Sequence, residues 1–291
     1  MDKKSIRDLI NTLKEHDPML EVLPYLDAAS RVLIADVTNR SANAGADKAF
    51  FAIPGNVKDG HSFIKDAIER GCRVIVCEKV PDAKKKKNAK EKAAEDKEIV
   101  FIKVTNSARA WAIAAHWQFG FPAQGMTLVG VTGTNGKTTV ATSIFTIWKN
   151  IGIMSGLIST IENRIGEQVF PTEHTTPDAY DIAALFAQMK AKKVTHVVME
   201  VSSHALAQER VAGLKFKVAI FTNLTQDHLD FHETMEKYAA EKKKLFTNHM
   251  DLTDKNSLAI INADDQYVRL MAEGLKCRVA LYGMKSPEYG Q

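Results

Sequence analysis

A glycine-rich run that contains one lysine, GVTGTNGKTTV at positions 130–140, is the segment of this chain with the clearest chemical potential. Glycines let the backbone turn so that successive amides converge on phosphate oxygens, and a helix that begins just after them directs its positive end to the same place. A lysine can then reach the β and γ phosphates, and a threonine hydroxyl can ligate magnesium. The run departs from the usual G-x-x-x-x-G-K-[ST] spacing, because Val131 stands where the first glycine would fall. We therefore expect a nucleotide site formed by Gly133, Thr134, Asn135, Gly136, Lys137, Thr138 and Thr139, with Thr138 also binding magnesium.

Polar residues follow two later apolar runs of the chain. Glu200 ends the run THVVME, and Asn223 ends the run KVAIFTN. In an open parallel sheet the residues just past the carboxyl ends of the strands line the ligand crevice, so both should face the phosphate loop. A carboxylate there can hold magnesium against the nucleotide, which is the role expected of Glu200, with Asn223 beside the nucleotide. Four more residues fit metal binding or catalysis as well as they fit helix capping: Asp227, His228, Asp230 and His232.

One lysine of the helical pattern ETMEKYAAEKKKLF at 233–246 is expected to point inward. Lys242 has Tyr238 one turn before it and Phe246 one turn after it, whereas its two lysine neighbours have more polar or smaller surroundings. Burial disfavours the ammonium form, and a neutral amine can react with carbon dioxide to give a carbamate, an anion able to bind magnesium. The residues alone favour the more ordinary interpretation, a lysine whose stem lies along a half-buried helix and whose ammonium reaches water.

Alternating strands and helices must position these residues. Strands separated by helical stretches imply a parallel, doubly wound sheet, and the segment GFPAQG at 120–125 breaks the pattern. The expected fold class is α/β, with a small N-terminal α/β domain over 1–122 and a P-loop domain with a mostly parallel, doubly wound sheet over 123–291. Strands are expected at 32–37, 49–53, 73–78, 99–104, 127–133, 195–201, 217–223 and 257–262, and helices at 62–70, 107–117, from 137 onward and at 233–246.

The composition is that of a globular protein, since 45% of the 291 residues are hydrophobic and 25% are charged, which excludes disordered and fibrous classes. Much of the formal charge of +4 lies in a lysine-rich segment at 83–98, interpreted as an exposed insertion and too weak a signal for a nucleic-acid partner. Cys72, Cys77 and Cys277 form no C-x-x-C pair, so neither a disulfide framework nor a zinc site is indicated. No run approaches the ~20 apolar residues that a bilayer requires. We expect a cytoplasmic protein with no membrane partner.

The ordered motifs of the chain resemble one family. The Mur ligases share them, and the resemblance is nearest to the ligases that add a diamino acid to UDP-N-acetylmuramoyl-L-alanyl-D-glutamate. It covers nearly the whole chain, except the lysine-rich segment. The motifs are VTNR at 37–40, KAFFAIPGNVKDGHSFI at 48–64, GVTGTNGKTT, HTTPDA at 174–179, MEVSSHALAQERV at 199–211, FTNLTQDHLDFH at 221–232, YAAEKKKLF at 238–246 and INADD at 261–265.

The resemblance implies an ATP-dependent amide ligase that acts in peptidoglycan synthesis. ATP would phosphorylate the D-glutamate side chain to an acyl phosphate, which the amine of meso-diaminopimelate or L-lysine would attack. Two magnesium ions are expected, because the acceptor carboxylate and the triphosphate repel one another. The catalytic set would be Lys137, Glu200, His228 and Lys242; Thr138 and Glu200 would hold one magnesium, and His228 with carbamylated Lys242 the other. Thr175, Thr176, Ser202, Gln208 and Arg210 would surround the muramoyl pyrophosphate and sugar, and Thr38, Asn39 and Arg40, where the family usually has Asp-Ser-Arg, would lie near the uridine.

Family members of this type have a third, carboxy-terminal domain, which is expected to be absent here because the chain stops at SPEYGQ. A gene fragment, a split enzyme completed by a separate chain and a protein that binds ligands without catalysis would each fit this sequence. Little ligase activity is expected of the chain alone.

Two other readings belong to different classes of protein. A non-catalytic module that binds nucleotide or the UDP-muramoyl peptide is one. Another amide ligase, such as a folylpolyglutamate synthase, shares the phosphate loop but not SSHALAQERV. A plain P-loop kinase or GTPase would leave HTTPDA and DHLDFH unexplained.

Overall fold

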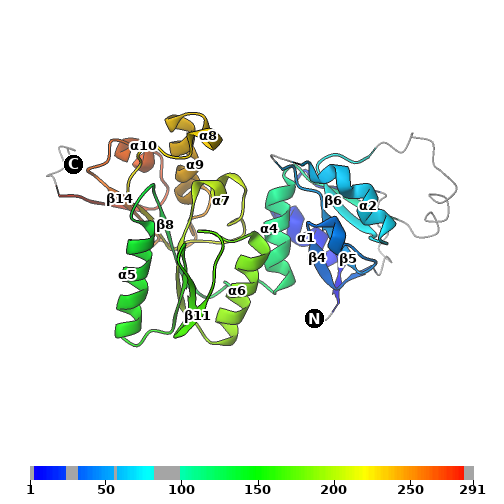
Figure 1. Ribbon diagram of the computed structural model, residues 1–291, viewed down its shortest axis with the longest axis horizontal. Helices are drawn as coiled ribbons and strands as arrows, with labels where there is room; N and C mark the ends of the chain where they lie inside the picture. The colour runs from blue at the N-terminus through cyan, green and yellow to red at the C-terminus, as the bar shows by residue number, and fades with distance from the viewer. Residues whose placement is uncertain (1–2, 24–31, 56–57, 82–98, 285–291) are drawn as a thin grey trace. The chain divides into compact units, whose positions relative to one another are not determined.

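The computed structural model describes residues 3–23, 32–55, 58–81 and 99–284, so the lysine-rich segment at 83–98 lies outside the described residues. The chain divides into two compact units, Met1–Gly120 and Phe121–Gln291, which Figure 1 colours from blue to green and from green to red. No helix in the described part of the chain is long and apolar enough to cross a membrane. The fold class is α/β, as the sequence pattern predicts.

A five-stranded sheet forms the first unit, with the order β2-β7-β6-β5-β4. β2 is antiparallel to β7, and the other pairs are parallel. Phe50 packs with α2 in one cluster, while the next residue, Phe51, lies 5.5 Å from the Trp111 ring of α4, so alternate residues of β5 contact opposite helical layers. The elements are β2 (Glu21–Leu23), β4 (Asp36–Thr38), β5 (Lys48–Phe51), β6 (Val74–Cys77), β7 (Val100–Lys103), α1 (Ile6–His16), α2 (Ile64–Glu69), α4 (Ser107–Gln118) and the 3-10 turns η1 (Ser41–Asn43) and η2 (Gly60–Phe63).

The single strand expected at 32–37 is wrong, because the structure breaks it at Ala35. β3 (Leu33–Ile34) pairs with β1 (Lys4–Ser5) in a two-stranded sheet, whereas β4 pairs with β5 in the main sheet. Between them the Ala35 amide donates to the Asp47 carbonyl at 2.7 Å. One apolar run therefore contributes strands to two different sheets. Its hydrophobicity alone does not indicate this division.

A buried histidine in α4 should make this unit sensitive to acid. His116 is 1% exposed, and burial lowers its pKa from 6.5 to about 4. Between these two pKa values the unfolded chain binds more protons than the folded one, so stability is fully present above pH 6.5 and is lost as the pH falls toward 4. Because of His116, the free energy of unfolding should fall by about 3 kcal/mol between pH 7 and pH 4, and His116→Leu should abolish this fall. Urea unfolding at the two pH values would measure it. His16→Leu, at an exposed histidine of the same unit, should leave the loss unchanged, and an equal loss in both variants would contradict the prediction.

An eight-stranded sheet forms the second unit, with the order β11-β10-β9-β12-β8-β13-β14-β15. Six neighbouring strands run parallel, in the order β9, β12, β8, β13, β14 and β15. At the β9 edge, β10 and β11 extend the sheet as antiparallel strands. The strands are β8 (Thr127–Thr132), β9 (Ser155–Ile158), β10 (Asn163–Ile165), β11 (Gln168–Phe170), β12 (His196–Glu200), β13 (Val218–Phe221), β14 (Leu258–Asn262) and β15 (Arg278–Tyr282). The sheet is mostly parallel, as expected for this domain.

Helices cover both faces of this sheet. On one face, Val129, Val198 and Ile220 pack in a cluster with Phe145 of α5. Their neighbours in the same strands, including Leu128 and Val197, pack on the other face with α6 and α9. Figure 1 shows α5 and α6 on opposite sides of the strands. The helices are α5 (Lys137–Asn150), α6 (Ala179–Ala191), α7 (Ser203–Ala207), α8 (Leu229–His232), α9 (Met235–Thr247) and α10 (Val268–Ala272).

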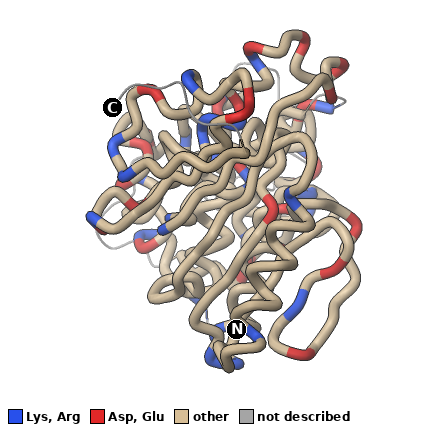
Figure 2. Tube along the Cα trace, turned by 90° about the vertical axis from the view of Figure 1, so that its left-hand side faces the viewer, with Lys and Arg blue, Asp and Glu red and all other residues tan. Residues whose placement is uncertain are grey.

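Charged residues of both signs are interspersed along the trace in Figure 2. Several form exposed ion pairs, such as Arg70 with Asp66 at 3.0 Å and Lys149 with Glu167 at 2.9 Å. Exposed pairs of this kind contribute little to stability, because solvent screens them. The stability of each unit therefore rests mainly on its sheet and helix packing.

Candidate functional site

The phosphate loop occupies the turn between β8 and α5, at the centre of the second sheet. β8 ends at Thr132 and α5 begins at Lys137, as the sequence predicts. Gly133 has φ +148, and a Cβ there would come within 1.9 Å of the Thr222 Oγ1 atom. Gly136 has φ +85 and caps the helix. Val131 lies inside the strand, so the turn is made two residues later than in the usual spacing, at Gly133.

The loop is bonded to the segment that follows the neighbouring strand β13. The Thr134 amide donates to the Asn223 carbonyl at 2.8 Å, and the Asn135 amide donates to Asn223 Oδ1 at 3.0 Å. Asn223 Nδ2 in turn donates to the Asn135 carbonyl at 3.0 Å. These two loop amides are thus engaged within the protein. The amides at the start of α5, from Lys137 onward, have no partner inside their own helix and are the ones suited to an anion.

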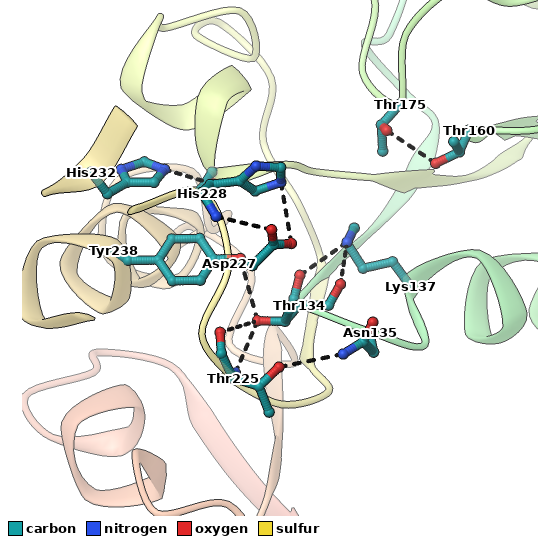
Figure 3. A network of polar contacts seen from close by, with 12 residues as sticks. Thr134, Asn135, Lys137, Thr160, Thr175, Thr225, Asp227, His228, His232 and Tyr238 are labelled. Carbon is teal, nitrogen blue, oxygen red and sulfur yellow. Dashed lines mark hydrogen bonds and ion pairs between the residues drawn. The ribbon is translucent and has the colours of Figure 1, made fainter. Parts of the chain in front are cut away.

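Two lysines far apart in the sequence meet at one carbonyl of this loop. Lys137 Nζ donates to the carbonyls of Gly133 at 3.0 Å and Thr134 at 2.9 Å, which Figure 3 shows in part. Lys242 Nζ donates to the same Gly133 carbonyl at 2.9 Å. The loop thus holds two amino groups beside the place where phosphate would bind.

Burial changes the protonation of both lysines. Burial lowers the pKa of Lys137, and the carboxylates of Glu200 and Asp227 partly oppose this. Lys242 is only 1% exposed, and burial together with the charge of Lys137 lowers its pKa well below 10.5. Lys243, the next residue, is partly exposed, so the helical spacing identified the inward lysine correctly. A deprotonated amine at Lys242 is therefore easier to form than on an exposed lysine.

Glu200 ends β12 and is completely buried. Its Oε1 accepts the Thr160 amide at 2.9 Å, and its Oε2 lies 3.2 Å from the Thr160 hydroxyl. Its charge also acts on Lys137, which places the carboxylate beside the phosphate loop. Sequence reasoning missed Thr160, which follows β9, because nothing in its neighbourhood signals that it contacts a residue 40 positions away.

The five residues expected around the muramoyl pyrophosphate lie in one hydrogen-bonded group. Thr176 Oγ1 accepts the Ser202 amide at 3.1 Å, and the Thr176 carbonyl accepts Arg210 Nη1 at 2.7 Å. Arg210 Nε also donates to Gln208 Oε1 at 2.9 Å, and the Thr175 hydroxyl lies 3.1 Å from that of Thr160. This group is attached to the Glu200 backbone through Thr176, whose hydroxyl donates to the Glu200 carbonyl at 2.9 Å.

The three residues expected near the uridine belong to the first unit. Thr38 ends β4, and its hydroxyl oxygen accepts the Arg40 amide at 3.1 Å. Thr38 is buried, Asn39 is partly exposed and Arg40 is exposed. The turn they form presents Asn39 and Arg40 to solvent, where they could contact a ligand.

The residues after β13 form an aromatic and histidine cluster beside the loop. His228 has φ +51 and its Nε2 lies 3.4 Å from Asp227 Oδ2. The ring of His204 packs edge-on against His228, with centroids 4.8 Å apart. His232 is buried and bonds Ser203 Oγ at 2.9 Å; burial, and then the charge of His204, lower the pKa of His232 to about 4. The His228 side chain is 48% exposed, so it is more accessible to a ligand than His232, which is buried and bonded to Ser203.

Tyr238 connects these parts, and sequence reasoning used it only as a neighbour of Lys242. Its hydroxyl lies 3.3 Å from Thr134 Oγ1, and its ring centroid lies 4.4 Å from Lys242 Nζ and 4.9 Å from the His232 ring. Figure 3 shows Tyr238 pointing from its helix toward Thr134. The one available signal was its place one turn before Lys242 on the same helix face.

Removing the Tyr238 hydroxyl should loosen the phosphate loop. We expect Tyr238→Phe to weaken nucleotide binding about 3-fold to 10-fold, since one hydrogen bond to Thr134 is lost while the ring contact with Lys242 stays. Calorimetric titration with ATP would measure this. Tyr267→Phe, in the loop before α10, serves as the control, and equal affinities of the two variants would refute the prediction.

Metal-binding groups are sparse among the residues that the structure describes. No group of three or more His, Cys, Asp or Glu side chains is arranged there to hold a metal ion. Cys72, Cys77 and Cys277 are all free thiols. A metal at this site would therefore need further ligands besides one or two such residues, for example a hydroxyl, a modified lysine or phosphate oxygens.

Family models match both units of the chain. The model described as the Mur ligase middle domain matches residues 131–290, and the model described as the Mur ligase family, catalytic domain, matches residues 33–116. The UDP-N-acetylmuramoyl-L-alanyl-D-glutamate–2,6-diaminopimelate ligase of Bacteroides fragilis is 41% identical over 251 residues, which cover 86% of this chain and 48% of the relative.

Solved structures share the fold. A structure of UDP-N-acetylmuramoyl-L-alanyl-D-glutamate–2,6-diaminopimelate ligase has a TM-score of 0.73 at 22% identity and covers 99% of this chain and 54% of its own. MurF from Thermotoga maritima in complex with ADP has a TM-score of 0.51 at 21% identity and covers 86% of this chain and 51% of its own. The chain spans about half the length of the curated relatives it matches. With one family model matched over more than half of its residues and a second over most of its first unit, the chain belongs to the Mur ligase family.

Proposed function

We propose that this chain carries the nucleotide and acceptor sites of a ligase that joins a diamino acid, meso-diaminopimelate or L-lysine, to the D-glutamate of UDP-N-acetylmuramoyl-L-alanyl-D-glutamate in peptidoglycan synthesis. The family membership and the names of the relatives support this. The observation that carries the proposal is the meeting of Lys137 and Lys242 at the Gly133 carbonyl, next to Glu200. A P-loop kinase has no need of the second buried lysine.

In this proposal the nucleotide is held by the loop and the start of α5. Lys137 would exchange its bonds to the Gly133 and Thr134 carbonyls for the β and γ phosphates of ATP. Thr138 and Thr139 would offer first-turn amides, and Asn223 would keep the loop in shape. An oxygen of the D-glutamate side chain attacks the γ phosphorus and ADP leaves. The amine of the diamino acid then attacks the acyl carbon, phosphate leaves, and the amine loses a proton.

Magnesium fits part of this site by donor chemistry. The Thr138 hydroxyl and the Glu200 carboxylate are oxygen donors, the kind that magnesium prefers, so they would hold one ion. His228 and the amine of Lys242 offer nitrogen, and the second ion fits only if Lys242 is carbamylated. The buried amine, with its lowered pKa, suits that reaction, in which the amine adds to carbon dioxide and releases a proton. Magnesium would supply neutralisation of the repulsion between the triphosphate and the acceptor carboxylate.

The acceptor would be bound by the group around Thr176. Thr175, Ser202 and Arg210 would contact the pyrophosphate and sugar, with Gln208 fixing the arginine. A guanidinium is suited to phosphate oxygens, and one already held by two acceptors loses less freedom on binding. Thr38, Asn39 and Arg40 would contact the uridine end.

Binding experiments test this function on the chain itself. We expect calorimetric titrations to show binding of ATP with magnesium and of UDP-N-acetylmuramoyl-L-alanyl-D-glutamate, but not of folate. Failure to bind the UDP-muramoyl dipeptide, or preference for folate, would overturn the proposal. Phosphate release with each diamino acid in turn would then distinguish a ligase from a module that only binds these ligands.

A further inference from the structure

Thr160 is placed to control the position of Glu200. It follows β9, and β9 pairs in parallel with β12, the strand that ends at Glu200. Within the described residues, two hydrogen bonds reach the Glu200 carboxylate, and Thr160 supplies both, one from its amide at 2.9 Å and one from its hydroxyl at 3.2 Å. A carboxylate that is 0% exposed requires such donors, because burial removes its water. One residue therefore fixes both oxygens.

The hydroxyl of Thr160 also connects Glu200 to the acceptor group. It lies 3.1 Å from the Thr175 hydroxyl oxygen, in the geometry of a donor to it. Thr160 has only one hydroxyl hydrogen, and an ionised carboxylate can only accept. The single hydroxyl hydrogen of Thr160 can therefore serve either the Glu200 carboxylate or the Thr175 oxygen at one time, while the Thr160 amide serves Glu200 throughout. Figure 3 shows Thr160 and Thr175 side by side on the side of the loop where Lys137 lies.

We propose that Thr160 is a positioning residue that holds the Glu200 carboxylate toward the phosphate loop and joins it to Thr175 in the acceptor group. The inference rests on the proposed function, in which Glu200 binds the magnesium that accompanies the nucleotide. With the carboxylate fixed, little freedom is lost when the ion binds. The connection to Thr175 also gives the acceptor a route by which its binding affects the nucleotide side.

Paired titrations of the full chain with ADP test this role without needing turnover. One titration uses excess magnesium and the other uses EDTA. Thr160→Val removes the hydroxyl but keeps the amide and the shape, Thr160→Ser restores the hydroxyl, and Thr146→Val is the matched control. Thr146 is an exposed residue of α5 whose hydroxyl bonds the Thr142 carbonyl of its own helix at 2.8 Å.

We expect Thr160→Val to weaken ADP binding about 10-fold in magnesium and to leave binding in EDTA unchanged, because the lost hydrogen bond positions Glu200, which would act on the nucleotide only through the magnesium ion. Thr160→Ser and Thr146→Val should match the unsubstituted chain in both titrations. The inference fails if Thr160→Val keeps its magnesium-dependent affinity, if Thr160→Ser loses as much as Thr160→Val, or if Thr160→Val weakens both titrations equally. If the unsubstituted chain binds ADP equally well with and without magnesium, the proposed function and this inference both fall.

Discussion

Replacing Gly133 by alanine should abolish nucleotide binding and lower the free energy of unfolding of the second unit by about 2–5 kcal/mol. The added Cβ would lie 1.9 Å from Thr222 Oγ1 and 3.0 Å from two backbone atoms of Asn223, and φ +148 is unfavourable for alanine. The Gly133 carbonyl that both lysines contact would have to move. Calorimetric titration with ATP and urea unfolding would measure the two effects.

Gly152→Ala separates strain from collision in this experiment. Gly152 also has a positive φ, +80, but nothing lies within 4 Å of its missing Cβ. The Gly152→Ala variant should lose stability through backbone strain alone and keep its nucleotide affinity. In the double variant Gly133→Ala/Thr222→Ala the nearest contact is relieved, so part of the stability should return without nucleotide binding. Normal ATP affinity in Gly133→Ala would show that the loop is not shaped by this contact.

Replacing Lys242 by methionine should leave a protein that is at least as stable as the original but unable to form the carbamate. The side chain is 1% exposed, so an apolar residue of similar length removes the cost of a buried amine and can add up to about 2 kcal/mol at pH 7. The Gly133 carbonyl keeps a donor, because Lys137 still bonds it. Phosphate release in the proposed reaction should fall at least about 100-fold, since the carbamate that would bind the second magnesium is lost.

The carbamate itself offers a direct readout of this substitution. With ¹³C-labelled bicarbonate, the unsubstituted chain should show a carbamate carbon signal that Lys242→Met lacks. Lys243→Met, at the partly exposed neighbour, should keep the signal. A signal that survives Lys242→Met would place the modification on another lysine.

The same variant should change how stability depends on pH. In the folded protein the pKa of Lys242 lies well below 10.5, so between that pKa and 10.5 the unfolded chain binds more protons than the folded chain. Stability contributed by this group therefore rises with pH across that window and is absent below it. Urea unfolding from pH 7 to pH 10 should show a steeper rise in the unsubstituted chain than in Lys242→Met. Parallel curves would mean that Lys242 titrates like an exposed lysine.

Local patterns were sufficient for the elements that carry the nucleotide site. The switch from an apolar run to helical spacing at Lys137 predicts the strand, turn and helix, and all three lie in adjacent residues. The same holds for Lys242, whose neighbours at helical spacing identify its buried face. Pairing partners were harder to predict. The run at 32–37 divides between two sheets, and the antiparallel hairpin of β10 and β11 was not anticipated, because hydrophobicity does not say which strand lies alongside.

By itself the sequence determined the α/β class, the family and the residue types of the site, since these depend on periodicity and on motifs that lie in continuous segments. Only the tertiary structure decided which side chains meet. Lys242 is 109 positions from the Gly133 carbonyl that it bonds, and Thr160 is 40 positions from Glu200. Such contacts arise because parallel strands bring their carboxyl ends to one edge of the sheet whatever the length of chain between them.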